Sequence, residues 1–218
     1  MTEKKERSVL SIVTPTYNRG KLLKRAYESL VTQTCKDFEW IIIDDGSSDD
    51  TEEIVSSFIS DFPIKYKKQK NGGKHTALNT SHSIVDGKYV LILDSDDYLT
   101  KNAVETVIRE WKLCEQQSNI GIVTFLKGSA IDKPSCIAND ERVPVDIMRY
   151  QRTCFHSSDC CEVIRTELFK KYPFPVFENE KFVSEGALWT RVSFTHQCIY
   201  INEVIYIAEY LEGGLTKS

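Results

Sequence analysis

Three carboxylates lie within four consecutive positions in the middle of the chain, in the stretch Asp94-Ser95-Asp96-Asp97. The preceding residues, Val90 to Leu93, are all apolar and predict a buried strand that ends at this acidic stretch. Carboxylates placed this close repel one another unless a cation lies among them, and their hard oxygen atoms suit Mg²⁺ or Mn²⁺ better than Zn²⁺. The stretch therefore predicts a metal site, although an acidic turn that caps a helix near Asn102 would give the same pattern.

Two earlier strands also end in polar turns. Residues 9–13 predict a first strand that runs into Thr14-Pro15-Thr16-Tyr17-Asn18, and residues 38–43 predict a second that runs into Asp44-Asp45-Gly46-Ser47. In open α/β sheets, ligands bind outside the carboxyl ends of the strands. These turns are therefore expected to lie beside the acidic stretch and to share one site with it.

The segments between these strands show helical spacing of apolar residues. Helices are predicted from about Leu22 to Gln33, around residues 54–59, from Lys74 to Val85 and from about Ala103 to Trp111, with a further strand at residues 64–69. Alternating strands and helices indicate a mostly parallel sheet with helices on both faces. The predicted fold class is thus α/β, Rossmann-like, with three layers.

After residue 120 this alternation breaks. The expected elements are a strand at 121–126, a loop or hairpin at 127–145, a strand at 161–165, a helical turn at 166–171, a helix at 185–196 and closing strands at 199–210. Neither an internal repeat nor a low-complexity linker interrupts the sequence. One continuous domain over residues 1–218 is the simplest interpretation.

Composition narrows the class of protein. The chain has 218 residues, 41% of them apolar, so it can bury a full core, and its net charge of -4 disfavours nucleic acid as a partner. Five lysines between residues 65 and 74 predict a solvated face, of which one or two could contact phosphate or an anionic membrane surface. Seven scattered cysteines without CxxC spacing, and no signal or membrane-spanning segment, favour a cytoplasmic protein.

Taken together, the turn at residues 14–18, the acidic turn at 44–47, Gly73-Lys74 with Ala77-Leu78-Asn79, and the acidic stretch at 94–97 resemble the family 2 glycosyltransferases of GT-A fold. The resemblance spans roughly residues 8 to 120 and continues more loosely to the end. It implies a nucleotide-sugar-binding half at about 8–120 and an acceptor-binding half at about 121–218.

The resemblance also implies roles for individual residues. The nucleotide-sugar donor, expected to be a UDP-sugar, would contact Pro15, Thr16, Tyr17, Asn18, Asp45, Gly73, Lys74, Asn79, Asp94, Ser95 and Asp96. Tyr17 would stack on the base, Asp45 would read its edge, and Lys74 would approach the diphosphate. Asp96 and Asp97 would hold Mg²⁺ or Mn²⁺. On the residues alone, Tyr17 as a packed aromatic, Asp45 as a turn or cap residue and Lys74 as a solvated charge remain open.

A base is needed to take a proton from the acceptor hydroxyl. In the family this carboxylate begins a late helix, commonly as a Glu-Asp pair; here Gly186 replaces the second acid and leaves Glu185 as the candidate. Ser184 could instead cap the helix, with Glu185 only a favourable first-turn charge. Glu178 and Glu180 are the substitutes.

The function implied by the resemblance is an inverting transfer of sugar from a UDP-sugar to a glycan or lipid-linked hydroxyl in surface polysaccharide assembly, with possible peripheral membrane association. A metal-dependent nucleotidyltransferase would need a Gly-rich, basic first turn, which Thr14 to Asn18 is not. A catalytically silent sugar-nucleotide-binding module is the other alternative. The sequence identifies neither the sugar, the acceptor nor the oligomeric state, and relatives often continue beyond the equivalent of its last residues.

Overall fold

The computed structural model describes residues 8–150 and 159–208, whose strands form a single sheet in the order β3-β2-β1-β4-β8-β6-β9-β5, with β7 paired to β6. The strands are β1 (Leu10–Thr16), β2 (Phe38–Asp44), β3 (Ile64–Lys68), β4 (Tyr89–Ile92), β5 (Tyr98–Leu99), β6 (Ile120–Ala130), β7 (Lys133–Pro134), β8 (Cys160–Arg165) and β9 (Gln197–Ile207). The helices are α1 (Gly20–Val31), α2 (Thr51–Ser56), α3 (Lys74–Ser81), α4 (Ala103–Cys114), α5 (Ile147–Tyr150), α6 (Thr166–Lys171) and α7 (Gly186–Ser193).

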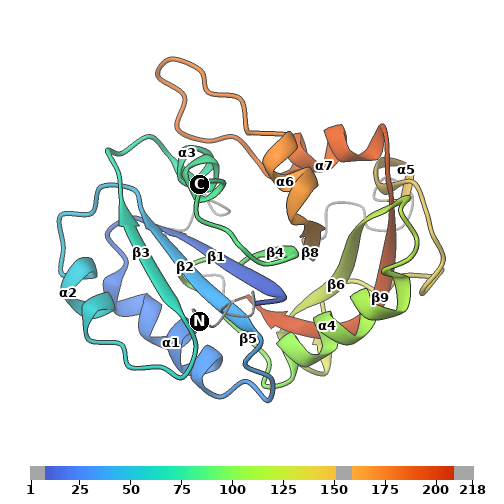
Figure 1. The fold of residues 1–218 in the computed structure, drawn as a ribbon, viewed down its shortest axis with the longest axis horizontal. Coiled ribbons are helices and arrows are strands. Elements are labelled where there is room, and N and C mark those ends of the chain that lie inside the picture. Colours follow the sequence, from blue (N-terminus) through green and yellow to red (C-terminus); the bar gives the residue numbers. More distant parts are fainter. Residues whose placement is uncertain (1–7, 151–158, 209–218) are drawn as a thin grey trace, which may run out of the picture.

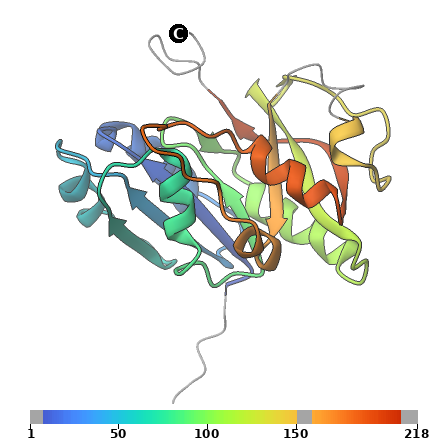
Figure 2. The ribbon, with the colours of Figure 1, turned by 90° about the horizontal axis from the view of Figure 1, so that it is seen from above.

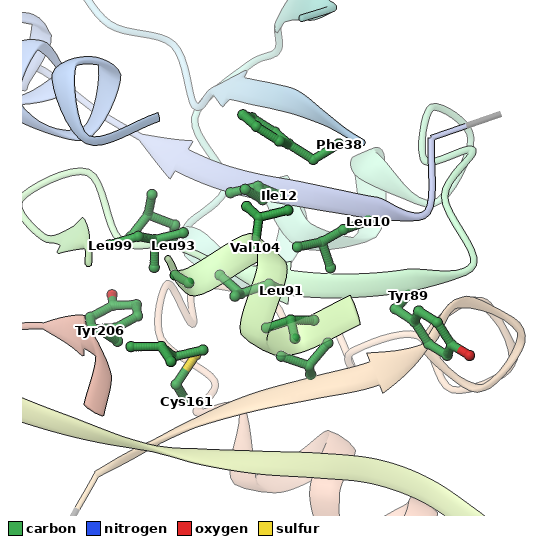
Figure 3. Packing of buried hydrophobic residues seen from close by; sticks show 14 of the residues in the cluster. Leu10, Ile12, Phe38, Tyr89, Leu91, Leu93, Leu99, Val104, Cys161 and Tyr206 are labelled. Carbon is green, nitrogen blue, oxygen red and sulfur yellow. The ribbon is translucent and has the colours of Figure 1, made fainter. Parts of the chain in front are cut away.

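Helices cover both faces of the sheet and give it three layers. Apolar residues of α1, α2 and α4 pack on one face, and apolar residues of α3, α5, α6 and α7 pack on the other. Figure 1 shows α3, α6 and α7 together on one side of the sheet, opposite α1 and α4. Figure 3 shows part of the first core, where Leu10, Ile12 and Leu91 lie against Val104 of α4. The predicted α/β architecture is confirmed.

The register of the parallel strands brings their carboxyl ends to one edge. Thr16 at the end of β1 pairs with Asp44 at the end of β2, and Val13 pairs with Ile92 at the end of β4. Consequently the turns that follow β1, β2 and β4 lie side by side, as the sequence predicted. This shared edge is where the candidate site forms.

The second half of the sheet departs from the parallel pattern. Strand β8 runs antiparallel to both β4 and β6, whereas β6 and β9 are parallel to each other. Because β8 is reversed, its first residues, rather than its last, lie near the carboxyl end of β4. The sequence predicted this strand but not its direction.

Most predicted elements are present, with shifted ends. Helix α3 ends at Ser81 rather than Val85, and α7 covers Gly186–Ser193 rather than 185–196. The region 127–145, predicted as a loop or hairpin, begins as a hairpin, because β6 continues to Ala130 and pairs antiparallel with β7. Strand β5, which pairs with β9, was not predicted. The predicted end of the closing strand, at residues 209–210, lies outside the described residues.

Trp111 of α4 offers a test of the packing. Its side chain is fully buried and stacks on Tyr89, with ring centroids 4.1 Å apart, while its indole N–H has no hydrogen-bond partner within the described part of the chain. We expect Trp111→Ala to lower the free energy of unfolding by about 3–5 kcal/mol through the cavity it leaves. Trp111→Phe should cost clearly less, because it keeps a stacked ring and removes an unsatisfied donor. Urea unfolding measures both, and equal losses would contradict this packing.

Candidate active site

The turns after β1 and β2 are tied to each other by hydrogen bonds. The backbone N–H of Asp45 donates to the carbonyl oxygen of Thr16 at 2.8 Å. The backbone N–H of Asn18 donates to Ser47 Oγ at 2.9 Å, and the N–H of Ser48 donates to Asn18 Oδ1 at 2.8 Å. Asn18, predicted to bind the donor, therefore has its side chain engaged in joining the two turns, and its φ of 52° places it in the left-handed region.

The first turn leaves two groups available to a ligand. The Tyr17 ring is 48% exposed, beside the buried residues Pro15 and Thr16. The hydroxyl oxygen of Thr16 is buried and has no hydrogen-bond partner among the described residues. Because a buried unsatisfied hydroxyl is unfavourable, Thr16 is a natural place for a polar group of a ligand to bind. The exposure of Tyr17 argues against its being only a packed aromatic.

Asp45 holds the loop between β3 and α3. Its carboxylate accepts hydrogen bonds from Gln69 Nε2 at 2.7 Å, Asn71 Nδ2 at 3.1 Å, and the backbone N–H groups of Gly72 and Gly73 at 2.9 and 2.7 Å. Both oxygens are thereby occupied and the residue is buried. The side chain that was predicted to read a base thus fixes, in this structure, the loop that leads to Lys74.

Lys74 connects the acidic stretch to the late helix. As the first residue of α3, it places its Nζ 2.5 Å from Asp94 Oδ1 and 2.5 Å from Glu185 Oε1. Burial alone would lower the pKa of Lys74, but the charges of the two carboxylates outweigh burial and raise it. Burial likewise opposes ionisation of Asp94, yet Lys74, Lys127 and Arg19 hold the pKa of Asp94 below its usual value. Lys74 and Asp94 are therefore both charged at neutral pH.

Gly73 allows the close approach that this ion-pair network requires. Its φ is +94°, and a Cβ atom at this position would lie 2.1 Å from the carbonyl oxygen of Lys181 in the loop between α6 and α7. Lys181 Nζ also donates to Asn71 Oδ1 at 2.9 Å. The β3–α3 loop and the α6–α7 loop are therefore packed together, which brings Glu185 to Lys74. Figure 2 shows this second loop passing over α3.

Asp96 and Asp97 have different surroundings. Asp96 Oδ2 pairs with Arg19 Nη1 at 2.9 Å, and Arg25 donates to the backbone carbonyl of Asp96. Asp97 is buried, and its Oδ2 accepts a hydrogen bond from the Tyr206 hydroxyl at 2.7 Å. The Tyr206 oxygen also accepts the backbone N–H of Asp94 at 3.0 Å. Tyr206 lies beside Leu93 and Leu99 at one end of the core in Figure 3.

The carboxylates of the acidic stretch suit a cation that binds together with phosphate. Within residues 8–150 and 159–208, no three His, Cys, Asp or Glu side chains form a group that could hold a metal ion. Mg²⁺, however, is commonly bound by one or two carboxylates together with substrate phosphates. Asp96, paired with a partly exposed arginine, fits such a shared site, whereas Asp97 is buried and its Oδ2 accepts the Tyr206 hydroxyl. Asp97 as a metal ligand stays a prediction.

Asn79 and Ser95 are two further residues that were predicted to contact the donor. The Asn79 amide donates to the carbonyl of Phe174 at 2.9 Å and accepts the N–H of Phe174 at 2.7 Å, so this side chain anchors the start of the α6–α7 loop. Ser95 is buried within the acidic turn. The Asn79 side chain is therefore occupied by Phe174, and both residues stay predicted donor contacts.

Glu185 is the late carboxylate that reaches the acidic stretch. It lies at the N-cap of α7, where no side chain makes a capping hydrogen bond, so the alternative in which Ser184 caps the helix is wrong. Glu180 is exposed and accepts the N–H of Phe182 at 2.8 Å, and Glu178 is exposed as well. The structure thus places Glu185, and not its substitutes, on Lys74.

Sequence reasoning missed several residues around this site. Arg19, Arg25, Lys127 and Tyr206 all neutralise or hold the acidic stretch, yet none belongs to a recognised pattern. Lys127 is largely buried on β6, with its Nζ 4.4 Å from the Tyr206 ring centroid and 3.7 Å from Asp159 Oδ2. The only available signal was Lys127 itself, a single charge directly after an apolar strand.

Comparison with known proteins decides the family. Residues 11–172 match the profile of Glycosyl transferase family 2, which is most of the chain. The chain belongs to glycosyl transferase family 2. The resemblance seen in the strand-end turns is therefore confirmed.

Two relatives match this family-2 chain over nearly all of its length. Glycosyltransferase GlyG of Streptococcus pneumoniae is 27% identical over 96% of this chain and 73% of its own length. A Campylobacter jejuni protein named GalNAc(5)-diNAcBac-PP-undecaprenol beta-1,3-glucosyltransferase is 27% identical over 91% of this chain and 63% of its own.

Among solved structures, Staphylococcus aureus TarS 1-349 in complex with UDP-GlcNAc superimposes with a TM-score of 0.77 at 23% identity. The match covers 96% of this chain and 60% of that one, so it supports the GT-A fold, and this chain spans little more than half of the TarS fragment. None of the helices in the described residues is long and apolar enough to cross a membrane.

The contact at Gly73 gives a prediction for the site. Gly73→Ala should displace the α6–α7 loop from Lys74 and reduce donor binding by about tenfold or more, because the new methyl group meets backbone and the φ is unfavourable for alanine. Gly186→Ala is the matched control, since its Cβ would lie 3.2 Å from Ser184 Oγ, a side chain that can rotate away. Calorimetric titration with UDP measures both variants. Unchanged binding by Gly73→Ala would show that this loop contact does not shape the site.

Proposed function

We propose that this chain is an inverting glycosyltransferase that moves a sugar from a UDP-sugar to the hydroxyl of a glycan or lipid-linked acceptor. The observation that carries the proposal is the placement of Lys74 between Asp94 and Glu185, which puts a cation, the acidic strand end and a candidate base at one point. Membership of glycosyl transferase family 2 supports the reaction class.

The donor would bind along the turns at the strand ends. The exposed Tyr17 ring would stack on the base, and the buried Thr16 hydroxyl would accept or donate a hydrogen bond there. Asp45 would act through the loop that it fixes, and Lys74 would turn from its carboxylates to the diphosphate. The bound ligands named for TarS, UDP-GlcNAc and UDP, support uracil as the base.

Mg²⁺ or Mn²⁺ would be held by Asp96 together with diphosphate oxygens. When bound, such an ion supplies positive charge that stabilises the departing diphosphate. Arg19, which pairs with Asp96, supplies a cation at this carboxylate in the ligand-free chain. Asp97 would support the turn through Tyr206. A Mn²⁺ complex of the mannosyltransferase PcManGT, a structural neighbour, is consistent with a metal in this fold.

Glu185 would act as the base in a single displacement. Its carboxylate takes the proton of the acceptor hydroxyl while that oxygen forms a bond to C1 of the sugar. The bond from C1 to the diphosphate oxygen breaks on the opposite face, and the leaving diphosphate keeps the electron pair. Lys74 offsets the charge that develops on this group. One displacement inverts the anomeric centre.

The acceptor would be met by residues after 120. A lipid-linked glycan is supported by the name of the Campylobacter relative, which includes PP-undecaprenol. Assembly of a surface polysaccharide at the cytoplasmic face of a membrane, with peripheral association, follows from that acceptor class. A catalytically silent sugar-nucleotide-binding module would show the same donor contacts without turnover.

The base assignment predicts a separation of binding from turnover. Glu185→Gln should lower kcat by about 100-fold or more, because the amide cannot accept the proton, while UDP binding changes by less than about threefold. Glu178→Gln, an exposed carboxylate in the preceding loop, is the matched control and should retain activity. UDP release from each sugar nucleotide is the measurement. Full turnover by Glu185→Gln would remove this residue from the base role.

The assignment of Asp96 as a metal ligand predicts that its replacement removes the activity that depends on Mn²⁺. Asp96→Asn should abolish the stimulation of UDP release by Mn²⁺, because an amide oxygen is a much weaker ligand than a carboxylate. Asp49→Asn in the second turn serves as a control, since Asp49 bonds to Thr51 and Gly20. The rate of UDP release, measured at increasing Mn²⁺ concentrations, distinguishes the two variants. An Asp96→Asn enzyme with the wild-type metal response would contradict the assignment.

A further inference from the structure

Glu162 is an acidic residue on the central part of the sheet that the proposed mechanism does not use. It lies on β8 and pairs with Thr124 of β6. On its other side, Val163 pairs with Leu91 of β4, so the next step of the register brings Glu162 beside Ile92, two residues before Asp94. Paired residues point to the same face of a sheet. Glu162 therefore faces the side covered by α3 and α7, which carry Lys74 and, at its N-cap, Glu185.

The Glu162 carboxyl lacks the partners that a buried ion normally has. Apart from a hydrogen bond with its own backbone N–H, the carboxyl makes no hydrogen bond or ion pair within the described residues, and Glu162 keeps some exposure to solvent. Burial raises its pKa to about 8, partly opposed by Lys127 and reinforced by Asp159 and Glu185. At neutral pH it is mostly a neutral carboxylic acid, with one O–H donor and one carbonyl acceptor.

We propose that Glu162 is a specificity-determining residue that binds a hydroxyl or acetamido group of the transferred sugar. The inference rests on the proposed function, because it needs a sugar attached to a diphosphate at Asp94 and Lys74. Position favours the transferred sugar over the acceptor, since Glu162 lies next to the end of the strand that carries Asp94. A neutral acid pairs with a neutral sugar group without placing another negative charge beside Glu185.

Two other roles for Glu162 predict different behaviour. A purely structural carboxyl would be expected to form hydrogen bonds with neighbouring residues of the sheet. No neighbouring residue in the described part of the chain makes such a bond with Glu162. A second base would have to be ionised, and replacement by glutamine would then abolish turnover. As a neutral acid that binds sugar, Glu162 should instead tolerate glutamine, which offers an N–H donor and a carbonyl acceptor in nearly the same places.

The test compares Glu162→Gln with Glu162→Leu by calorimetric titration with UDP, UDP-GlcNAc, UDP-GalNAc, UDP-glucose and UDP-galactose. Both variants should bind UDP as the wild type does. For the UDP-sugar that the wild type prefers, Glu162→Leu should lose about tenfold or more in affinity and Glu162→Gln less than about threefold. The differences in affinity among the four UDP-sugars should also become smaller in Glu162→Leu.

The outcomes separate this inference from the proposed function. A wild-type chain that binds neither UDP nor any UDP-sugar overturns both. If the wild type binds a UDP-sugar and Glu162→Leu binds it equally well, only the Glu162 assignment is wrong. If donor affinity is unchanged and the KM for an acceptor rises instead, the residue serves the acceptor and the inference fails. A loss by Glu162→Gln as large as that by Glu162→Leu rejects the neutral acid.

Thermal unfolding provides a readout that does not depend on any ligand. Between the ordinary glutamate pKa and about 8, folded Glu162 keeps a proton that the unfolded chain has lost, so its contribution to stability falls as pH rises. Relative to Glu162→Gln, the wild type should therefore lose Tm between about pH 5 and pH 8. Among the described residues, the titratable groups around Glu162 are Lys127, Asp159, Glu185, Cys136, Cys160, Cys161, Cys198 and Tyr200. A Tm difference between the wild type and Glu162→Gln that does not change with pH would contradict a protonated Glu162.

Discussion

The ion pairs of Lys74 hold the two halves of the site together. One ammonium group meets a carboxylate from the end of β4 and a carboxylate from the start of α7, elements far apart in the chain. Like charges at Asp94 and Glu185 would otherwise repel each other. These ion pairs are partly buried, and removing one partner would leave the other charges less well compensated. The geometry of the site therefore depends on one lysine and on the glycine that precedes it.

The sheet places these charges and then restrains them. Parallel register aligns the ends of β1, β2 and β4, and the reversed strand β8 brings a second set of side chains to the same edge. Arg19 lies against Asp96, and Tyr206 ties the backbone of Asp94 to the carboxylate of Asp97. Each acidic group is thus held by a different partner. A diphosphate entering the site would meet cations already placed by the fold.

Much of this arrangement could be predicted from the sequence, and the limits have physical causes. Apolar runs that end in Asp94 and Asp45 located the strand ends, and the residues of the turns identified the family. The base at Glu185, which the resemblance implied, stays a prediction. Roles that depend on contacts between distant segments could not be predicted. Asp45 bonds to a loop more than twenty residues away, and the Asn79 amide bonds to Phe174. Nor does any local pattern mark Glu162, which becomes notable only because β8 is antiparallel.

A crystal structure of the chain with UDP and Mg²⁺ would test the central claim most directly, through the position of the Lys74 ammonium group. We expect Nζ to lie within hydrogen-bonding distance of a diphosphate oxygen, with the carboxylate of Glu185 released from Lys74. UDP bound elsewhere, with Lys74 still bridging Asp94 and Glu185, would contradict it.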